Sequence, residues 1–377
     1  MLHSKIRNRS KSVGISLDQR ILTIKPQADQ NIDDFLRRSC CFKIVQGTEV
    51  LANETLFFDI PIHLKAPASI DCDSYLIALL MDGMMNADLI RVKGSVSKKL
   101  LSNLTDYQSI WKCWSPDTMK PIQIEVEQVV SNLKKAEGVA AAFSGGLDAV
   151  FTLWRHHKKE AGWQSKPPTV AVLLHGMDIP LDNEKFFKLA FASCSKTTQS
   201  AGIPLVPIRT NFREVTKAPW EFSCGLGLVA SLSQLKLQAG DLLLGSSEPY
   251  DALVSPWGTH PMTDVLLSAE DFEVNHDGAA YSRSMKTKII NQWPESTANL
   301  RVCWIKNGSE LNCNKCEKCL RSIMNFLSNG AKLPKSLQHA ESLVARIKQV
   351  KLKGAVPINE WETILQMAKK IASGRLG

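Results

Sequence analysis

The chain has 377 residues, of which 44% are hydrophobic and 22% charged, and its formal net charge is +9. No apolar run approaches the ~20 residues of a membrane span, and the basic N-terminus lacks the apolar stretch of a secretory signal, so we expect a cytoplasmic protein with no membrane partner. The charge permits nucleic-acid binding without demanding it, because much of it lies in Lys5–Lys11 and Lys332–Lys353, where a solvated basic surface is the simpler interpretation.

The first third of the chain predicts short strands and two helices. Segments with β-branched and aromatic residues predict strands at Arg20–Ile24, Cys41–Val45, Leu56–His63, Ala87–Ser95 and Ile122–Val126. Apolar spacing of three and four residues predicts helices over Asp71–Met85 and Ser97–Trp114. Residues 1–130 are therefore expected to form an α+β domain without a chemical motif. A role for it in gripping substrate or in forming a homodimer is only a hypothesis.

A glycine-rich loop, Ser144–Asp148, follows an apolar run over Gly138–Phe143 and precedes a helical segment over Ala149–Arg155. Backbone N–H groups and the dipole at a helix start bind anions, and glycines let the backbone approach a phosphate. Ser144 adds a hydroxyl donor, and Asp148 is expected to hold Mg²⁺ against the phosphates. The alternative is a simple strand–helix turn in which Asp148 caps the helix. The loop is neither a P-loop nor a dinucleotide fingerprint.

Buried strands that alternate with helices predict an α/β, Rossmann-like parallel sheet with helices on both faces. The further strands are expected at Pro168–His175, Ile203–Ile208 and Asp241–Ser247, and the further helices at Asn183–Ala201 and Cys224–Gln238. Because ligands bind such sheets at the carboxyl ends of the strands, Ser144–Asp148, Gly176–Asp182 and Gly245–Glu248 are expected to share one site. Asp178 and Asp182 either belong to this site or cap the next helix.

The segment from Tyr250 to Asp277 has no clear periodicity and predicts a long functional loop. Within it, Trp257 could stack on a heterocyclic substrate, and His260 and Asp264 could recognise that substrate. Polar surface residues around a tight turn are an equally good interpretation.

A helix is expected over Arg283–Ile290, ending near Pro294. Lys286 and Lys288 lie on different faces of its start, and one of them could stabilise charge on ATP phosphates in a transition state. A lysine in a first helical turn opposes the helix dipole, which favours a functional reason for it.

Four of the ten cysteines form a C-x9-C-x2-C-x2-C cluster: Cys303, Cys313, Cys316 and Cys319. The two-residue spacing lets thiolates converge on one metal, and four thiolates predict structural, tetrahedral Zn²⁺. An iron–sulfur cluster is the main rival, but the ferredoxin pattern needs a further cysteine where Ile323 stands. Disulfides are not expected, because the other six cysteines look like buried apolar residues in a reducing compartment.

The Ser144–Asp148 loop resembles the SGGxDS pyrophosphate loop of the ATP pyrophosphatase (PP-loop) superfamily, with Ala149 in place of the last serine. The resemblance implies cleavage of ATP between its α- and β-phosphates and activation of a carboxylate, amide or carbonyl oxygen as an adenylate. A nucleophile then displaces AMP. The expected nucleotide contacts are Phe143, Ser144, Gly145, Gly146, Leu147, Asp148, His175, Gly176, Gly245 and Thr287.

The loop, the cysteine cluster, Leu320-Arg321 and Phe326 together resemble the 7-cyano-7-deazaguanine synthase family over Glu137–Gly330, about half of the chain. In that family a deazapurine carboxylate, 7-carboxy-7-deazaguanine, is adenylated, ammonia gives the amide, and a second ATP round gives the nitrile. The resemblance is also compatible with delivery of the activated carboxylate to an amine on a protein or nucleic acid. We therefore expect a core over residues 131–330 and a C-terminal extension, 331–377, with helices near 341–351 and 359–372.

Two other functions compete with an ATP-dependent ligase. A tRNA-modifying sulfur transferase of the same superfamily would need a redox-active cysteine pair, for which Cys194 and Cys224 are the candidates. A non-catalytic nucleotide-binding module is supported only by Ala149.

Overall fold

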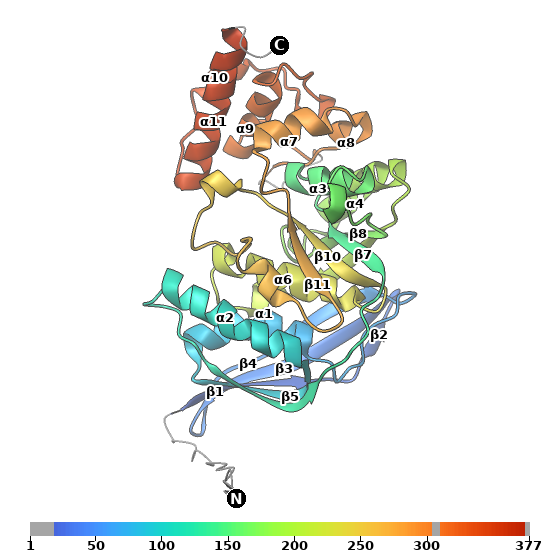
Figure 1. Ribbon diagram of the computed structural model, residues 1–377, viewed down its shortest axis with the longest axis vertical. Helices are drawn as coiled ribbons and strands as arrows, with labels where there is room; N and C mark the ends of the chain where they lie inside the picture. The colour runs from blue at the N-terminus through green and yellow to red at the C-terminus, as the bar shows by residue number, and fades with distance from the viewer. Residues whose placement is uncertain (1–18, 304–309, 374–377) are drawn as a thin grey trace, which may run out of the picture.

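The computed structural model describes residues 19–303 and 310–373, so the basic segment Lys5–Lys11 lies outside the described residues. Within them, eleven strands form one mixed, mostly parallel sheet flanked by helices (Figure 1). The strand order is β11-β10-β7-β8-β9-β4-β3-β1-β5-β6, and β2 pairs with β3 off this path. The chain is therefore an α/β protein.

The N-terminal elements confirm the expected strands and helices, but β1, β3, β4 and β6 are longer than predicted and β2 was not predicted. They are β1 (Arg20–Pro26), β2 (Gln30–Ile32), β3 (Phe35–Gln46), β4 (Glu49–Pro61), α1 (Asp73–Asn86), β5 (Leu89–Ser97), α2 (Lys98–Trp114) and β6 (Gln123–Val130). The hydroxyl of Ser97 caps α2 by accepting a hydrogen bond from Leu100 N at 3.4 Å, which explains where that helix begins.

The central elements contain five parallel strands. They are β7 (Gly138–Ala142), α3 (Leu147–His157), β8 (Val170–His175), α4 (Glu184–Ser200), β9 (Leu205–Thr210), α5 (Phe212–Val215), α6 (Trp220–Leu232), β10 (Ala239–Gly245) and β11 (Glu273–Asp277). On one side of β7 the sheet continues with β8 and then β9, and on the other side it continues with β10 and then β11. The strand order thus reverses beside β7, which makes its carboxyl end a topological switch point.

Helices cover both faces of the central sheet, as predicted. Alternate residues of the buried strands enter two hydrophobic clusters. Ala140 and Leu242 pack with residues of α1 and α6, whereas Ala141 and Leu243 pack with residues of α3 and α4. Strands that bury both faces are typical of parallel sheets enclosed by helices.

The sheet runs across the boundary expected at residue 130. Strand β4 pairs antiparallel with β9 through Phe58↔Thr210 and Asp59↔Arg209. The side chain of Asn211 reinforces this junction, because it accepts a hydrogen bond from Phe57 N and donates one to the carbonyl oxygen of Thr55. One hydrophobic cluster also spans both parts. Residues 19–130 and the core therefore share one sheet and one hydrophobic cluster. The division into separate domains stays a prediction.

The C-terminal helices gather at the end of the molecule opposite the N-terminal strands (Figure 1). They are α7 (Arg283–Ile290), α8 (Pro294–Ala298), α9 (Glu317–Leu327), α10 (Leu343–Ile347) and α11 (Ala355–Ala372). Two helices were expected in the extension; α10 is shorter and α11 longer than predicted. Among the helices the structure describes, none is both long and apolar enough to cross a bilayer.

Candidate functional site

The Ser144–Asp148 loop connects β7 to α3 at the switch point, as expected from the sequence. Gly145 has a φ of +73°, which favours glycine, and a Cβ there would lie 2.9 Å from Cys194 Sγ. Gly146 is the N-cap of α3, and its backbone N–H donates to Ser144 Oγ at 3.3 Å. The conformation of the turn therefore explains the glycine at position 145 without any ligand.

Arg301 fixes the loop from the other side. Its backbone N–H donates to Gly145 O and its Nε donates to Ser144 O, both at 2.8 Å. Its Nη1 lies 2.8 Å from Asp178 Oδ2, in the loop that follows β8. This buried guanidinium thus joins two strand ends, and no sequence motif singles it out.

The structure decides whether Asp178 and Asp182, which follow β8, cap the next helix. Asn183 caps α4 by accepting a hydrogen bond from Phe186 N at 3.2 Å, so the interpretation of Asp178 or Asp182 as that cap was wrong. Asp178 instead belongs to the group of side chains around the loop, and Asp182 is exposed.

Asp148 forms ion pairs with two cations from the start of α7. Its Oδ1 lies 3.0 Å from Lys286 Nζ and its Oδ2 lies 2.8 Å from Arg283 Nη2. Burial alone would raise the pKa of Asp148, but Arg283 and Lys286 hold it below its ordinary value. Lys286 is completely buried and also donates to the carbonyl oxygen of Ser246, whereas Lys288 is exposed. Of the two candidate lysines, only Lys286 faces the loop.

A cavity of about 90 Å³ lies between this loop and α9. On the loop side it is lined by Ser144, Gly146, Leu147, Asp148 and Ala149, and on the other sides by Arg283, Val302, Lys318, Arg321, Ser322 and Asn325. The four residues from α9 follow a spacing of three, one and three residues, which places them on one face of that helix. Their roles were missed, because this spacing matters only once the fold has brought α9 to the loop.

Arg321 is buried, and its Nε and Nη1 have no hydrogen-bond acceptor among the described residues. Glu317 Oε1 lies 3.0 Å from Nε as an ion pair, outside good hydrogen-bond geometry. Buried polar groups in folded proteins are normally hydrogen-bonded, so a guanidinium with two nitrogens that make no hydrogen bond to any described residue, beside a cavity, needs an explanation. A bound anion would supply the missing acceptors.

His175 and the two strand-end glycines have clear packing roles. The His175 ring is buried and stacks on Phe187 with 4.1 Å between ring centroids, and burial lowers its pKa. Gly176 has a φ of +94°, and a Cβ there would lie 1.7 Å from Thr210 O. A Cβ on Gly245 would lie 2.8 Å from Asp148 O. Nucleotide contacts at these three residues stay a prediction.

Phe143 and Thr287 are buried. Thr287 Oγ1 donates to Arg283 O at 2.8 Å within α7. Neither residue lines the cavity, so contacts between their side chains and a nucleotide stay a prediction.

The three residues expected to read a substrate do not line the cavity. His260 and Asp264 are buried, and His260 N donates to Asp264 Oδ1 at 3.0 Å. Asp264 Oδ2 lies 2.8 Å from His276 Nδ1, and the His260 ring packs edge-on against Trp114 of α2. These contacts give His260 and Asp264 a structural role.

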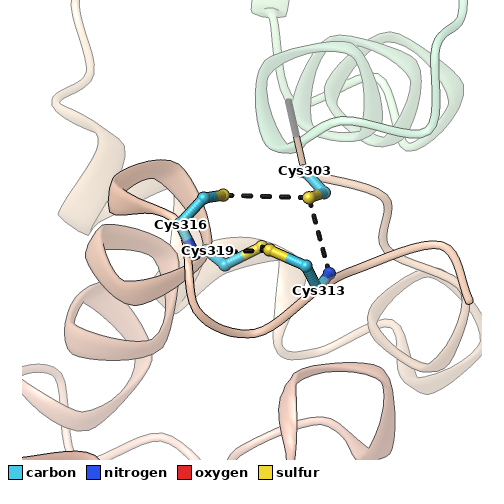
Figure 2. Close-up of side chains that lie close together, drawn as sticks. All are labelled: Cys303, Cys313, Cys316 and Cys319. Carbon is cyan, nitrogen blue, oxygen red and sulfur yellow. Dashed lines mark hydrogen bonds between the residues drawn. The ribbon is translucent and has the colours of Figure 1, made fainter. Parts of the chain in front are cut away.

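The four clustered cysteines converge, as Figure 2 shows, and their Sγ atoms all lie within 4.8 Å of one another. The Cys303–Cys316 and Cys313–Cys319 sulfur pairs are 3.7 and 3.9 Å apart. A tetrahedral ion with metal–sulfur bonds of ~2.3 Å would place its sulfurs about 3.8 Å apart. The arrangement therefore fits one four-coordinate metal ion.

Comparison with protein-family models, with curated proteins and with solved structures gave no match to this chain.

Proposed function

We propose that this chain is an ATP-dependent ligase of the PP-loop type, which adenylates a carboxylate and passes it to an amine. One observation carries the proposal: a glycine-rich loop at the topological switch point faces a cavity lined by Arg283, Lys318 and Arg321. Arg321 is buried, and its Nη1 has no hydrogen-bond acceptor in the part of the chain that the structure describes. A polyphosphate is the common ligand that meets a helix N-terminus and several guanidinium groups together.

The residues around the cavity suggest how the reaction would proceed. A carboxylate oxygen of the substrate attacks the α-phosphorus of ATP, the bond to the bridging α,β-oxygen breaks, and pyrophosphate leaves with the bonding electron pair. Lys286 and Arg283 are placed to offset the charge that develops on the leaving group, and Arg301 holds the loop in shape. An amine then displaces AMP, and little acid–base assistance is needed in the first step.

Mg²⁺ would add positive charge against the phosphates. Both oxygens of Asp148 already accept from Arg283 and Lys286, so this carboxylate would have to release one partner to hold the ion. We propose Zn²⁺ for the cysteine cluster, because a donor set of four thiolates suits structural zinc.

The proposed substrate is a deazapurine carboxylate of the 7-carboxy-7-deazaguanine type, on the resemblance of the loop and the cysteine cluster. Either ammonia or an amine on a protein or nucleic acid would complete the reaction. A cytoplasmic location and a homodimer also remain predictions.

The test is ATP–pyrophosphate exchange by zinc-loaded protein with 7-carboxy-7-deazaguanine. We expect exchange that depends on the carboxylate, with guanine as the control lacking it. Absence of exchange in protein that retains its metal would contradict the proposal.

The two competing functions have less support. Burial raises the pKa of Cys194 to about 11 and that of Cys224 to about 12, so both thiols are protonated at neutral pH. They also sit on α4 and α6, whose apolar residues pack on opposite faces of the sheet, which argues against a redox pair. Ala149 does line the cavity, so ATP binding without turnover of any carboxylate would favour the non-catalytic module.

A further inference from the structure

The cavity at the loop has a second wall, made by one face of α9. Lys318, Arg321 and Ser322 on that face all line the cavity. The opposite face of α9 is apolar, and its buried residues Leu320, Ile323 and Phe326 pack in the hydrophobic cluster that contains the loop's Leu147. The helix therefore holds its polar residues toward the loop by burying the other side.

The same helix begins inside the cysteine cluster. Cys316 is the N-cap residue of α9, and Cys319 lies in its first turn. Lys318 is the neighbour of Cys319, and Arg321 follows two residues later. Binding of one ion by Cys303 and Cys313 as well would tie the first turn of α9 to the segment that leaves Arg301, the residue that fixes the loop.

We propose that the metal held by the four cysteines positions α9 so that Arg321, with Lys318 and Ser322, binds the phosphates of the nucleotide opposite the glycine-rich loop. This inference rests on the proposed function, because it names the second half of the same phosphate site. It makes the cysteine cluster a positioning device for that site in addition to a stabilising element.

The state of Arg321 favours phosphate binding over a purely structural role. A structural arginine in a protein interior normally satisfies its donors with carbonyl or carboxylate oxygens. Arg301 does so, since its Nε and Nη1 both have oxygen partners at 2.8 Å. Arg321 is equally buried, yet among the described residues its Nη1 has no hydrogen-bond acceptor and its Nε meets only Glu317 Oε1, as an ion pair at 3.0 Å. The residue also lines the cavity.

The first experiment measures binding of magnesium pyrophosphate to the full chain by calorimetry. We expect Arg321→Gln to weaken binding by about 10-fold or more, because it removes hydrogen bonds between a charged donor and a charged phosphate. The matched control is Lys315→Gln, which removes an exposed positive charge beside the cluster, on a side chain that does not line the cavity. We expect it to change affinity by less than about 2-fold.

The second experiment removes the metal with a chelator and restores it with Zn²⁺. Stripped protein should bind pyrophosphate as weakly as Arg321→Gln, and hydrogen exchange in residues 317–327 should rise before it rises in the central sheet. Both changes should reverse when the metal returns. Arg321→Gln keeps all four thiols, so it tests the phosphate wall even if stripping unfolds the chain.

The outcomes separate the two proposals. Equal affinity of Arg321→Gln and Lys315→Gln would overturn the role of Arg321, and equal affinity of stripped and loaded protein would overturn that of the metal. Either result leaves the ligase proposal standing if exchange still depends on the carboxylate. Failure of loaded, unmutated protein to bind pyrophosphate or ATP would overturn both.

Discussion

Lys286 Nζ lies 3.0 Å from Asp148 Oδ1, and this contact joins the first turn of α7 to the first turn of α3. Arg283 approaches the other oxygen of the same carboxylate. The ion pairs therefore link two helix starts around the glycine-rich loop. Removing one member leaves the others buried without full compensation, which gives the site a measurable effect on stability.

Asp148→Asn should lower the free energy of unfolding at pH 7 by about 2 kcal/mol, because it removes the carboxylate that pairs with both Lys286 and Arg283. The pKa of Asp148 in the folded chain is below its ordinary value, so its stabilising effect is present above about pH 4 and is lost as pH falls through the folded pKa. Urea unfolding from pH 7 to pH 2 checks this. The variant should lose less stability on acidification than the unmutated chain, and parallel curves would contradict the prediction.

Lys286→Met should lower ATP–pyrophosphate exchange by about 100-fold, the typical effect of losing one donor that stabilises developing charge. Lys288→Met is the matched control, since Lys288 occupies the same helix but is exposed. It should retain exchange within about 3-fold of the original rate, the small effect expected of an exposed charge. Equal losses in both variants would argue against a specific role for Lys286.

Gly145→Ala should destabilise the chain by about 1–2 kcal/mol, because a φ of +73° is unfavourable for alanine and its Cβ would crowd Cys194 Sγ. Gly162→Ala measures the effect of a positive φ without crowding, since Gly162 has a φ of +57° and no atom lies within 4 Å of an added Cβ. Thermal unfolding should show a larger loss for Gly145→Ala, and Cys194→Ala should relieve part of it. An equal loss at both glycines would mean that crowding by Cys194 is unimportant.

Cys316→Ser should abolish stoichiometric metal binding, because all four sulfur atoms lie close enough to bind one ion and the variant removes one of them. The double variant Cys194→Ala, Cys224→Ala should keep both its metal and its ATP–pyrophosphate exchange. Elemental analysis of purified protein, paired with the exchange assay, checks both statements. Loss of activity in the double variant with metal intact would revive the sulfur-transfer hypothesis.

Local signals explain which parts of this architecture could be predicted. The apolar run before Ser144 and the amphipathic segment after it identify β7 and α3 without any long-range information. Cysteine spacing likewise predicts a metal cluster, because ligands two residues apart must converge. Strand β11 was not predicted, because an edge strand with the sequence Glu-Val-Asn-His-Asp has little apolar pattern.

The remaining errors concern residues whose role depends on distant partners. His260 and Asp264 suggested a polar recognition loop, yet both are buried. His260 packs against Trp114 of α2, which is distant in the sequence, and Asp264 pairs with His276 of β11, a strand that was not predicted. The roles of Arg301 and of the cavity-lining residues of α9 were not predicted, because their contacts also depend on residues that are distant in the sequence. Their neighbours are set by how the C-terminal helices return to the loop.

The pairing of β4 with β9 has a consequence for synthesis of the chain. While the ribosome is producing residues between these strands, β4 has β3 on one side and nothing yet on the other. An exposed strand edge of this kind can recruit a neighbouring nascent chain. We therefore expect aggregation during translation to be most pronounced for chains arrested before Leu205, and to decline once β9 has emerged.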